Sequence, residues 1–115
     1  MIINFRSKKI RNRAYWNREY SEYFGIQITK YQLEKNQKLK TEIYTRTILP
    51  IFDDLIQNLI RVYRFNPKCK KECLKLLCKS IHKFSIQSSH KAFSYFNIVA
   101  KGYLIMLHKR LNKNS

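Results

Sequence analysis

Three cysteines and a histidine are the residues of this sequence that most resemble a metal site. Thiolate and imidazole groups are common zinc ligands, and Cys69, Cys73, Cys78 and His82 could supply four of them. Because each residue of a helix turns by about 100°, the first two cysteines face one side of a helix, and Cys78 and His82 face nearly the opposite side. One helix cannot wrap these groups around one ion. We therefore interpret the cysteines as small core residues and expect no metal or other cofactor.

Residues that could catalyse a reaction are scarce. Asp53 and Asp54 are the only adjacent carboxylates, and they fall in the first turn predicted for a helix beginning at Ile51, where acids favour the helix dipole. The three histidines have no acidic neighbour in the sequence that would form a proton relay. Glycine occurs only at positions 25 and 102, so a glycine-rich phosphate loop is impossible. We expect neither enzymatic activity nor a small-molecule substrate.

Positive charge is the strongest signal that remains. The chain has 24 Lys and Arg against seven Asp and Glu, a formal net charge of +17 on 115 residues. Folding gathers these charges on a small surface, where they repel one another unless a polyanion neutralises them. At 44% hydrophobic and 14% aromatic, the chain is too apolar to be a disordered basic arm. An odd number of cysteines argues against a disulfide framework and favours a reducing compartment.

Basic and aromatic residues are interleaved near the N-terminus, which is typical of nucleic-acid binding. We expect the rings of Tyr15, Trp16, Tyr20, Tyr23 and Phe24 to stack on unpaired bases or pack against sugars while cations bind phosphates. The rings are scattered among the cations, whereas a membrane-binding helix gathers them on one face. The first candidate phosphate contacts are Arg6, Lys8, Lys9, Arg11, Arg13 and Arg18. Three residues further along the chain are expected to support them: Lys38, Lys40 and Arg46.

The elements that carry these residues are predicted to be helices. Two glycines and two prolines leave little material for the tight turns of a β fold. Apolar spacing and end signals predict helices over residues 7–24, 30–47, 51–65, 68–87 and 90–111. Gly25 is a plausible stop for the first helix. Pro50 either begins a new helix or kinks a longer one begun near Lys38, and Asn66 and Pro67 mark a loop.

The expected fold is all-α: a small antiparallel bundle of three main helices with a basic N-terminal helical extension. The extension covers residues 1–29 and the bundle domain covers residues 30–115. In the helix over residues 68–87, four lysines follow one another four residues apart, so they form a straight ridge on one side. The last three of them are a second group of candidate RNA contacts; the ridge is Lys71, Lys75, Lys79 and Lys83.

Part of the chain resembles a ribosomal family. Residues 36–45, from Asn36 through Lys40 and Thr41 to Thr45, resemble a stretch late in the first helix of the twentieth small-subunit ribosomal protein of bacteria and organelles. In that family an Asn is followed by a Lys-Ser pair, an aliphatic residue and a Thr. Residues 71–84 resemble its middle helix, and residues 109–112 its C-terminus. Four further positions are similar to its basic signature, although Gly102 replaces a second basic residue there: Lys91, Asn97, Ala100 and Lys101.

The resemblance covers about residues 30–112 and has structural and functional implications. It implies a three-helix bundle packed against small-subunit ribosomal RNA, and it adds Lys91 and Lys101 to the candidate RNA contacts. We therefore expect a structural RNA-binding protein of an organellar or bacterial-type ribosome, with ribosomal RNA and neighbouring ribosomal proteins as partners. The expected location is a mitochondrion, in preference to a plastid, or a bacterial-type cytoplasm.

Two other functions remain open at this stage. The first is a small phage or plasmid regulator that binds DNA or RNA as a helical dimer, with the apolar face of residues 51–63 as its interface. The second is a membrane-surface or interaction subunit of an organellar complex, whose binding would depend on lipid. The second is disfavoured by the scattered aromatic residues near the N-terminus.

Overall fold

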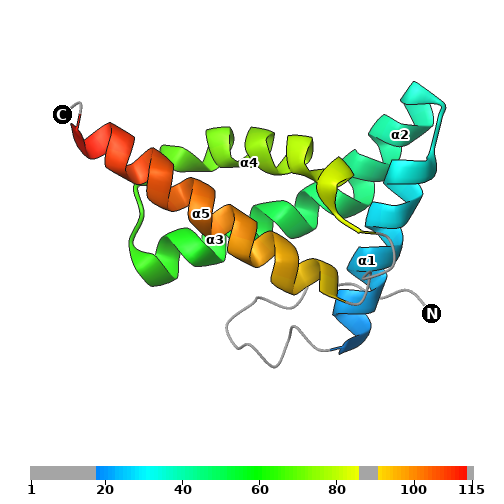
Figure 1. Cartoon of the computed structure of the whole chain (residues 1–115), viewed down its shortest axis with the longest axis horizontal. Helices are drawn as coiled ribbons and strands as arrows, with labels where there is room; N and C mark the ends of the chain where they lie inside the picture. The colour runs from blue at the N-terminus through cyan, green and yellow to red at the C-terminus, as the bar shows by residue number, and fades with distance from the viewer. Residues whose placement is uncertain (1–17, 86–90, 114–115) are drawn as a thin grey trace.

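The chain folds into helices that pack around one core (Figure 1). The computed structural model describes residues 18–85 and 91–113, and this part of the chain contains no strand. The predicted all-α class is therefore confirmed. In chain order, the elements are α1 (Arg18–Leu33), α2 (Gln37–Ile43), the π-helical turn η2 (Tyr44–Ile48), α3 (Leu49–Tyr63), α4 (Cys69–Ser80), the 3₁₀ turn η3 (Ile81–Lys83) and α5 (Ala92–Lys113).

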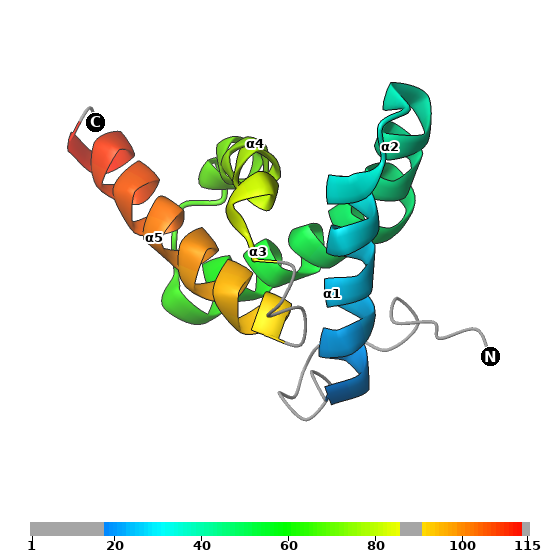
Figure 2. The same cartoon turned by 45° about the vertical axis from the view of Figure 1, so that its right-hand side comes forward.

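Helices α3, α4 and α5 run alternately in opposite directions and form the antiparallel bundle that the sequence predicts (Figure 1). Each of the three packs against the other two. Helix α1 crosses the end of this bundle where α4 finishes and α5 begins (Figure 2). It contacts η2, η3 and α5. The fold thus has a three-helix part and a crossing helix that closes one end of it.

Aromatic side chains fill the core where α1 meets the bundle. The fully buried rings of Phe24, Phe52 and Phe96 come from α1, α3 and α5. Their centroids are 5.2–5.8 Å apart. Such aromatic pairs contribute about 0.5–1.5 kcal/mol each beyond the area that they bury. This cluster therefore ties the crossing helix to the bundle.

The predicted helix stop at Gly25 is wrong, because α1 runs on to Leu33. Within α1, Tyr20, Phe24 and Ile28 are spaced four residues apart and are almost completely buried. Burial of these side chains outweighs the cost of about 1 kcal/mol for a glycine inside a helix. The predicted boundary after residue 29 falls inside this helix, so residues 18–29 share the core of the bundle. Residues 7–17, where the helix was expected to begin, lie outside the described residues.

The helix predicted over residues 30–47 is interrupted. The chain leaves the helical path after Leu33 and re-enters it at Asn36, whose side-chain oxygen accepts a hydrogen bond of 3.1 Å from the backbone N–H of Leu39. This is an ordinary N-terminal cap. From residue 37 to residue 63 the chain is then helical without a break. Pro50 cannot donate the N–H of an α-helical hydrogen bond, and the wider π turn lies directly before it.

Helix α4 is shorter than predicted. It ends at Ser80, followed by a 3₁₀ turn and an extended Phe84. The side-chain amide of Gln32 in α1 donates hydrogen bonds of 2.7 and 2.8 Å to the carbonyl oxygens of Ile81 and Phe84. The Ile81 carbonyl also accepts a hydrogen bond of 3.1 Å from the backbone N–H of Phe84. The carbonyls at a helix end need such partners, so α1 stabilises the early stop. The predicted loop over residues 64–68 and the last helix are confirmed to within two residues.

Candidate nucleic-acid interface

Helix α4 separates its apolar and basic sides cleanly. Cys69, Cys73 and Leu77 are buried against the bundle. The predicted ridge lies on the opposite side, and each of its four lysines is exposed: Lys71, Lys75 and Lys79 on α4, and Lys83 on η3. None of the four ammonium groups forms an ion pair with a described residue. Like charges about 6 Å apart repel one another, so a polyanion bound along the ridge relieves this repulsion.

Two candidate RNA contacts from different elements meet at one pocket. Lys83 at the end of η3 and Lys91 just before α5 both line a pocket of about 350 Å³. The hydroxyl-bearing Ser85 and Ser94 line it too, beside the rings of Phe84 and Tyr95. The two ring centroids are 5.1 Å apart. Ammonium and hydroxyl groups are the usual protein partners of phosphate oxygens, so the pocket continues the ridge onto α5.

Of the three candidate RNA contacts on α2 and η2, two are exposed to solvent and one contacts an aromatic cluster. Lys38 and Arg46 are exposed. Lys40 is half-buried, with its Nζ atom 4.6 Å from the centroid of the Tyr31 ring. Such a cation–π contact holds the ammonium group but leaves it charged. Lys40 therefore contacts the aromatic cluster and also keeps a positive charge that can bind a phosphate.

Side chains from several elements meet around Tyr31, and the sequence did not predict this group. Its ring centroid is 6.0 Å from that of Tyr44 and 5.7 Å from that of His82. Burial raises the pKa of both tyrosines above its ordinary value, and the Cys78 thiol adds to this effect. The two hydroxyls therefore remain neutral at physiological pH. We call this group of five, Tyr31, Lys40, Tyr44, Cys78 and His82, the Tyr31 junction.

Lys101 also lies over an aromatic ring. Its Nζ atom is 4.1 Å from the ring centroid of Tyr63 at the end of α3. Tyr63 is 43% exposed, so this pair is at the surface. Lys101, one of the two candidate RNA contacts that the resemblance adds, is thus held in place by a neighbouring helix.

Two of the aromatic residues expected to stack on bases do not. Tyr20 is 1% exposed and Phe24 is fully buried, so both belong to the core. Tyr23 is half-buried and packs against it. The prediction fails for these residues because α1 is part of the bundle and not a free extension. Arg18 is the first residue of α1. The other candidates near the N-terminus lie outside the described residues: Arg6, Lys8, Lys9, Arg11, Arg13, Tyr15 and Trp16.

The acidic pair also has a different role from the predicted one. Asp53 and Asp54 do not lie in a first helical turn, because the chain is already helical from residue 37. The Oδ1 atom of Asp53 lies 2.9 Å from Nζ of Lys70. This ion pair joins α3 to α4. The carboxylate of Asp53, one of seven acidic side chains in the sequence, is thus paired with Lys70 and does not neutralise a lysine of the ridge.

Two of the three cysteines pack as expected from the sequence. Cys69 and Cys73 are buried, which confirms their interpretation as core residues, whereas Cys78 is only half-buried. Burial raises the pKa of Cys69, and it raises that of Cys73 to about 12. Zinc binding requires the deprotonated thiolate, which these environments disfavour. Among the described residues, no group of three or more His, Cys, Asp or Glu side chains could hold a metal ion.

Comparison with known proteins finds no family model, no curated protein and no solved structure that matches this chain. Within residues 18–85 and 91–113, no helix has the length and apolar character needed to cross a membrane.

Proposed function

We propose that this protein is a structural RNA-binding protein of an organellar or bacterial-type ribosome, where it stabilises ribosomal RNA through phosphate contacts. The observation that carries the proposal is the row of four exposed lysines on α4 and η3, none of them paired with a described acid. A chain with a net charge of +17 needs a polyanionic partner to relieve its self-repulsion. RNA in a ribosome is such a partner.

The ridge is suited to binding a nucleic-acid backbone. Successive lysines are four residues apart, or about 6 Å along the helix axis, and their long side chains can follow the irregular path of a phosphate chain. Binding releases counterions from the RNA, so the affinity falls steeply with salt. Because A-form RNA hides most base edges, such a ridge recognises shape and charge more than sequence.

The resemblance to the twentieth small-subunit family supports a ribosomal setting for this RNA binding. The resemblance includes residues 36–45, which lie on α2 and η2, and residues 71–84, which lie mainly on α4 and η3. The regulator hypothesis is weakened in one respect. The apolar side chains of residues 51–63 that would form its dimer interface, such as Phe52 and Ile56, are buried inside the bundle.

Two double variants at the same positions, one that removes the charge and one that keeps it, test the role of the ridge. The double variant Lys75→Gln/Lys79→Gln should bind single-stranded RNA more weakly, and its plot of log affinity against log salt should be shallower by about 1.4, or 0.7 for each lost phosphate contact. The control Lys75→Arg/Lys79→Arg keeps both charges and should retain the slope. Equal affinities and slopes for all three proteins would remove the ridge from the interface.

Sedimentation tests the ribosomal setting. A lysate of the source cells is fractionated on sucrose gradients at low and moderate salt, and the protein is followed by mass spectrometry. We expect it to migrate with the small ribosomal subunit under both conditions. Its recovery only at the top of the gradient would contradict the proposal and favour a free regulator, which sedimentation of the purified protein would show as a symmetric dimer.

A further inference from the structure

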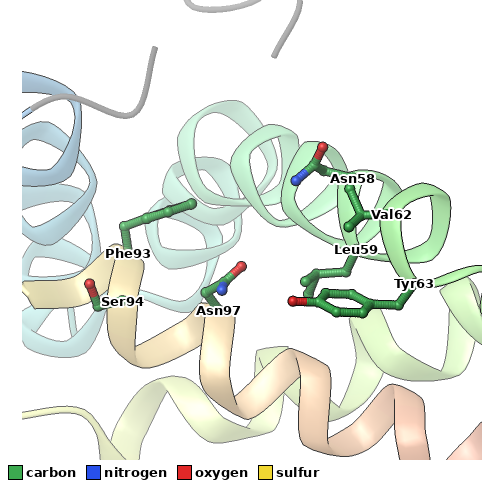
Figure 3. A pocket seen from close by; sticks show the side chains of 7 residues that line it. All are labelled: Asn58, Leu59, Val62, Tyr63, Phe93, Ser94 and Asn97. Atoms are coloured by element: carbon green, nitrogen blue, oxygen red, sulfur yellow. The ribbon is translucent and has the colours of Figure 1, made fainter. Parts of the chain in front are cut away.

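A second pocket lies between the last turns of α3 and the first turns of α5 (Figure 3). Its volume is about 270 Å³. Ser94 lines both this pocket and the one between Lys83 and Lys91, so the two are adjacent. We call it the Tyr63 pocket. Three aliphatic or aromatic residues of α3, the ring of Phe93 and three polar side chains line it: Leu59, Val62, Tyr63, Phe93, Asn58, Ser94 and Asn97.

The polar groups of this pocket have hydrogen-bonding capacity to spare. Asn97 is half-buried, and its amide has no hydrogen-bond partner among the described residues. The Oδ1 atom of Asn58 accepts a hydrogen bond of 2.8 Å from Nη2 of Arg61, which leaves the amide nitrogen of Asn58 as a donor. The amide atoms of Asn97 are not among the buried polar atoms that lack a partner, so they reach solvent. They are therefore open to a hydrogen bond from a ligand.

The remaining walls are flat or apolar. The ring of Phe93 extends into the space from α5, and the hydroxyl of Tyr63 points toward Asn97 (Figure 3). Lys101 holds its ammonium group over the Tyr63 ring, and Lys91 lines the adjacent pocket. The site therefore combines aromatic surface, an amide that can both donate and accept, and cations on either side.

We propose that the Tyr63 pocket takes one unpaired base of the bound RNA. Bases splayed out of a strand are recognised by stacking on aromatic rings and by hydrogen bonds to their edges, and an asparagine amide can pair with a base edge through both of its atoms. Phe93 and Tyr63 supply the rings, and Asn97 supplies the paired donor and acceptor. Lys91 and Lys101 take the flanking phosphates. This inference rests on the proposed RNA binding and adds base contacts to the phosphate contacts of the ridge.

Free nucleosides test the pocket without the ridge, because they carry no phosphate. Adenosine, cytidine, guanosine and uridine are each titrated into the full ¹⁵N-labelled chain, and the side-chain amide signals of Asn58 and Asn97 are followed by NMR. At least one nucleoside should shift both signals in a saturable way. If none of the four shifts either signal, the inference is overturned whether or not the protein binds RNA.

A variant in the same helix separates this inference from the proposed function. Asn97→Leu should weaken binding of a single-stranded RNA octamer by about tenfold, since one bidentate pair between an amide and a base edge is worth roughly 1–3 kcal/mol. It should leave duplex RNA binding unchanged, because the ridge is intact. The control Asn112→Leu changes an exposed amide of α5 outside the pocket and should bind both RNAs like the parent. Circular dichroism confirms that each variant is folded.

The outcomes distinguish the two failures. RNA binding by the parent with no difference between Asn97→Leu and Asn112→Leu would overturn the pocket and leave the ridge in place. Nucleoside shifts in a protein that binds no RNA would overturn the ribosomal proposal and keep the base site. An equal loss of duplex and single-strand affinity in Asn97→Leu would also contradict the inference, because it would show a general rather than a base-specific effect.

Discussion

Among the described residues, a lysine lies over a tyrosine ring at two sites, and the surroundings of these sites differ. In the Tyr31 junction, the Nζ atom of Lys40 is 4.6 Å from the ring centroid, and the rings of Tyr44 and His82 pack against the same tyrosine. At Tyr63, the Nζ atom of Lys101 is 4.1 Å from the centroid. There, the ring contributes to the wall of a pocket lined by polar side chains.

The difference indicates what each tyrosine does. The neighbours of Tyr31 come from η2, α4 and η3, so this ring joins α1 to the rest of the bundle. One ring neighbour of Tyr63 is Phe65, which lies two residues along the chain, with centroids 6.0 Å apart. One lysine–tyrosine pair therefore joins several elements of the bundle. The other lies beside a pocket.

Removal of each ring should give the largest difference. We expect Tyr31→Ala to lower the free energy of unfolding by about 2–3 kcal/mol, somewhat less than the 3–5 kcal/mol typical of a fully buried aromatic residue. Tyr63→Ala should cost about 1 kcal/mol, since Tyr63 is 43% exposed. Urea denaturation followed by circular dichroism measures both. Equal losses would mean that the two sites do not divide into a structural one and a ligand-facing one.

Alkaline pH should destabilise the protein through the Tyr31 junction. Burial and the Cys78 thiol raise the pKa of Tyr31 and Tyr44 above 10.0. The folded protein therefore holds these protons more tightly than the unfolded chain, so their contribution is complete below pH 10 and is lost as the pH rises through the folded-state values. The buried thiol of Cys73, with its pKa raised from 9.0 to about 12, acts in the same direction from about pH 9.

Denaturation between pH 8 and pH 11 measures this effect. The free energy of unfolding should be level up to about pH 9 and then fall, each raised group contributing at most about 1.4 kcal/mol per pH unit. Tyr44→Phe removes one such group, so its curve should be flatter above pH 10 than that of the parent. Parallel curves would show that the Tyr44 hydroxyl is not shielded in the folded protein.

The elements with strong apolar spacing could be predicted from the sequence. Helix α3 was expected over residues 51–65 and lies at Leu49–Tyr63, because its buried side chains recur at helical intervals. The stop at Gly25 was wrong for a physical reason: a glycine permits a helix to end, whereas the burial of Phe24 and Ile28 on either side of it requires the helix to continue. Local signals cannot show such packing.

The candidate site was predictable only in part. The lysine ridge follows from spacing within one helix, so the exposure of Lys75 and Lys79 was expected. The contact between Lys40 and Tyr31 spans a helix break, and the pocket joins Asn58 to Asn97, which are 39 residues apart in the sequence. No periodicity connects such residues. A lone asparagine among apolar residues of a helix, as at position 97, is the one local sign that could have indicated this pocket.

The backbone is strained at the end of α3, directly after Tyr63. Arg64 follows Tyr63 and adopts a left-handed conformation, with φ 56° and ψ 42°. This turn lets the backbone N–H of Phe65 donate a hydrogen bond of 3.1 Å to the carbonyl of Ile60 and brings the Phe65 ring to 5.6 Å from that of His108. A residue with a Cβ atom pays about 1–2 kcal/mol in this conformation.

Arg64→Gly should therefore stabilise the protein by about 0.5–1 kcal/mol, the relief of strain less the extra entropy of glycine in the unfolded chain. Thermal unfolding measures the gain. Arg64→Ala, which removes the side chain and keeps the Cβ atom, is the control and should give no such increase. If both variants are equally stable, the arginine side chain rather than its backbone determines the energy of this turn.

The coupling energy within each lysine–tyrosine pair is the smallest expected effect, and it tests the difference between the two sites most directly. Double-mutant cycles with Lys→Gln and Tyr→Leu measure the coupling energy within each lysine–tyrosine pair, and we expect about 0.5–1 kcal/mol for Lys40 with Tyr31 and for Lys101 with Tyr63. The cycles are then repeated with a nucleoside that shifts the Asn97 amide signal. A base stacked beside Tyr63 changes the surroundings of the Lys101 pair alone, so only that coupling should change. A change in both couplings would show that the ligand acts on the whole bundle, and a change in neither would leave Tyr63 outside the base site.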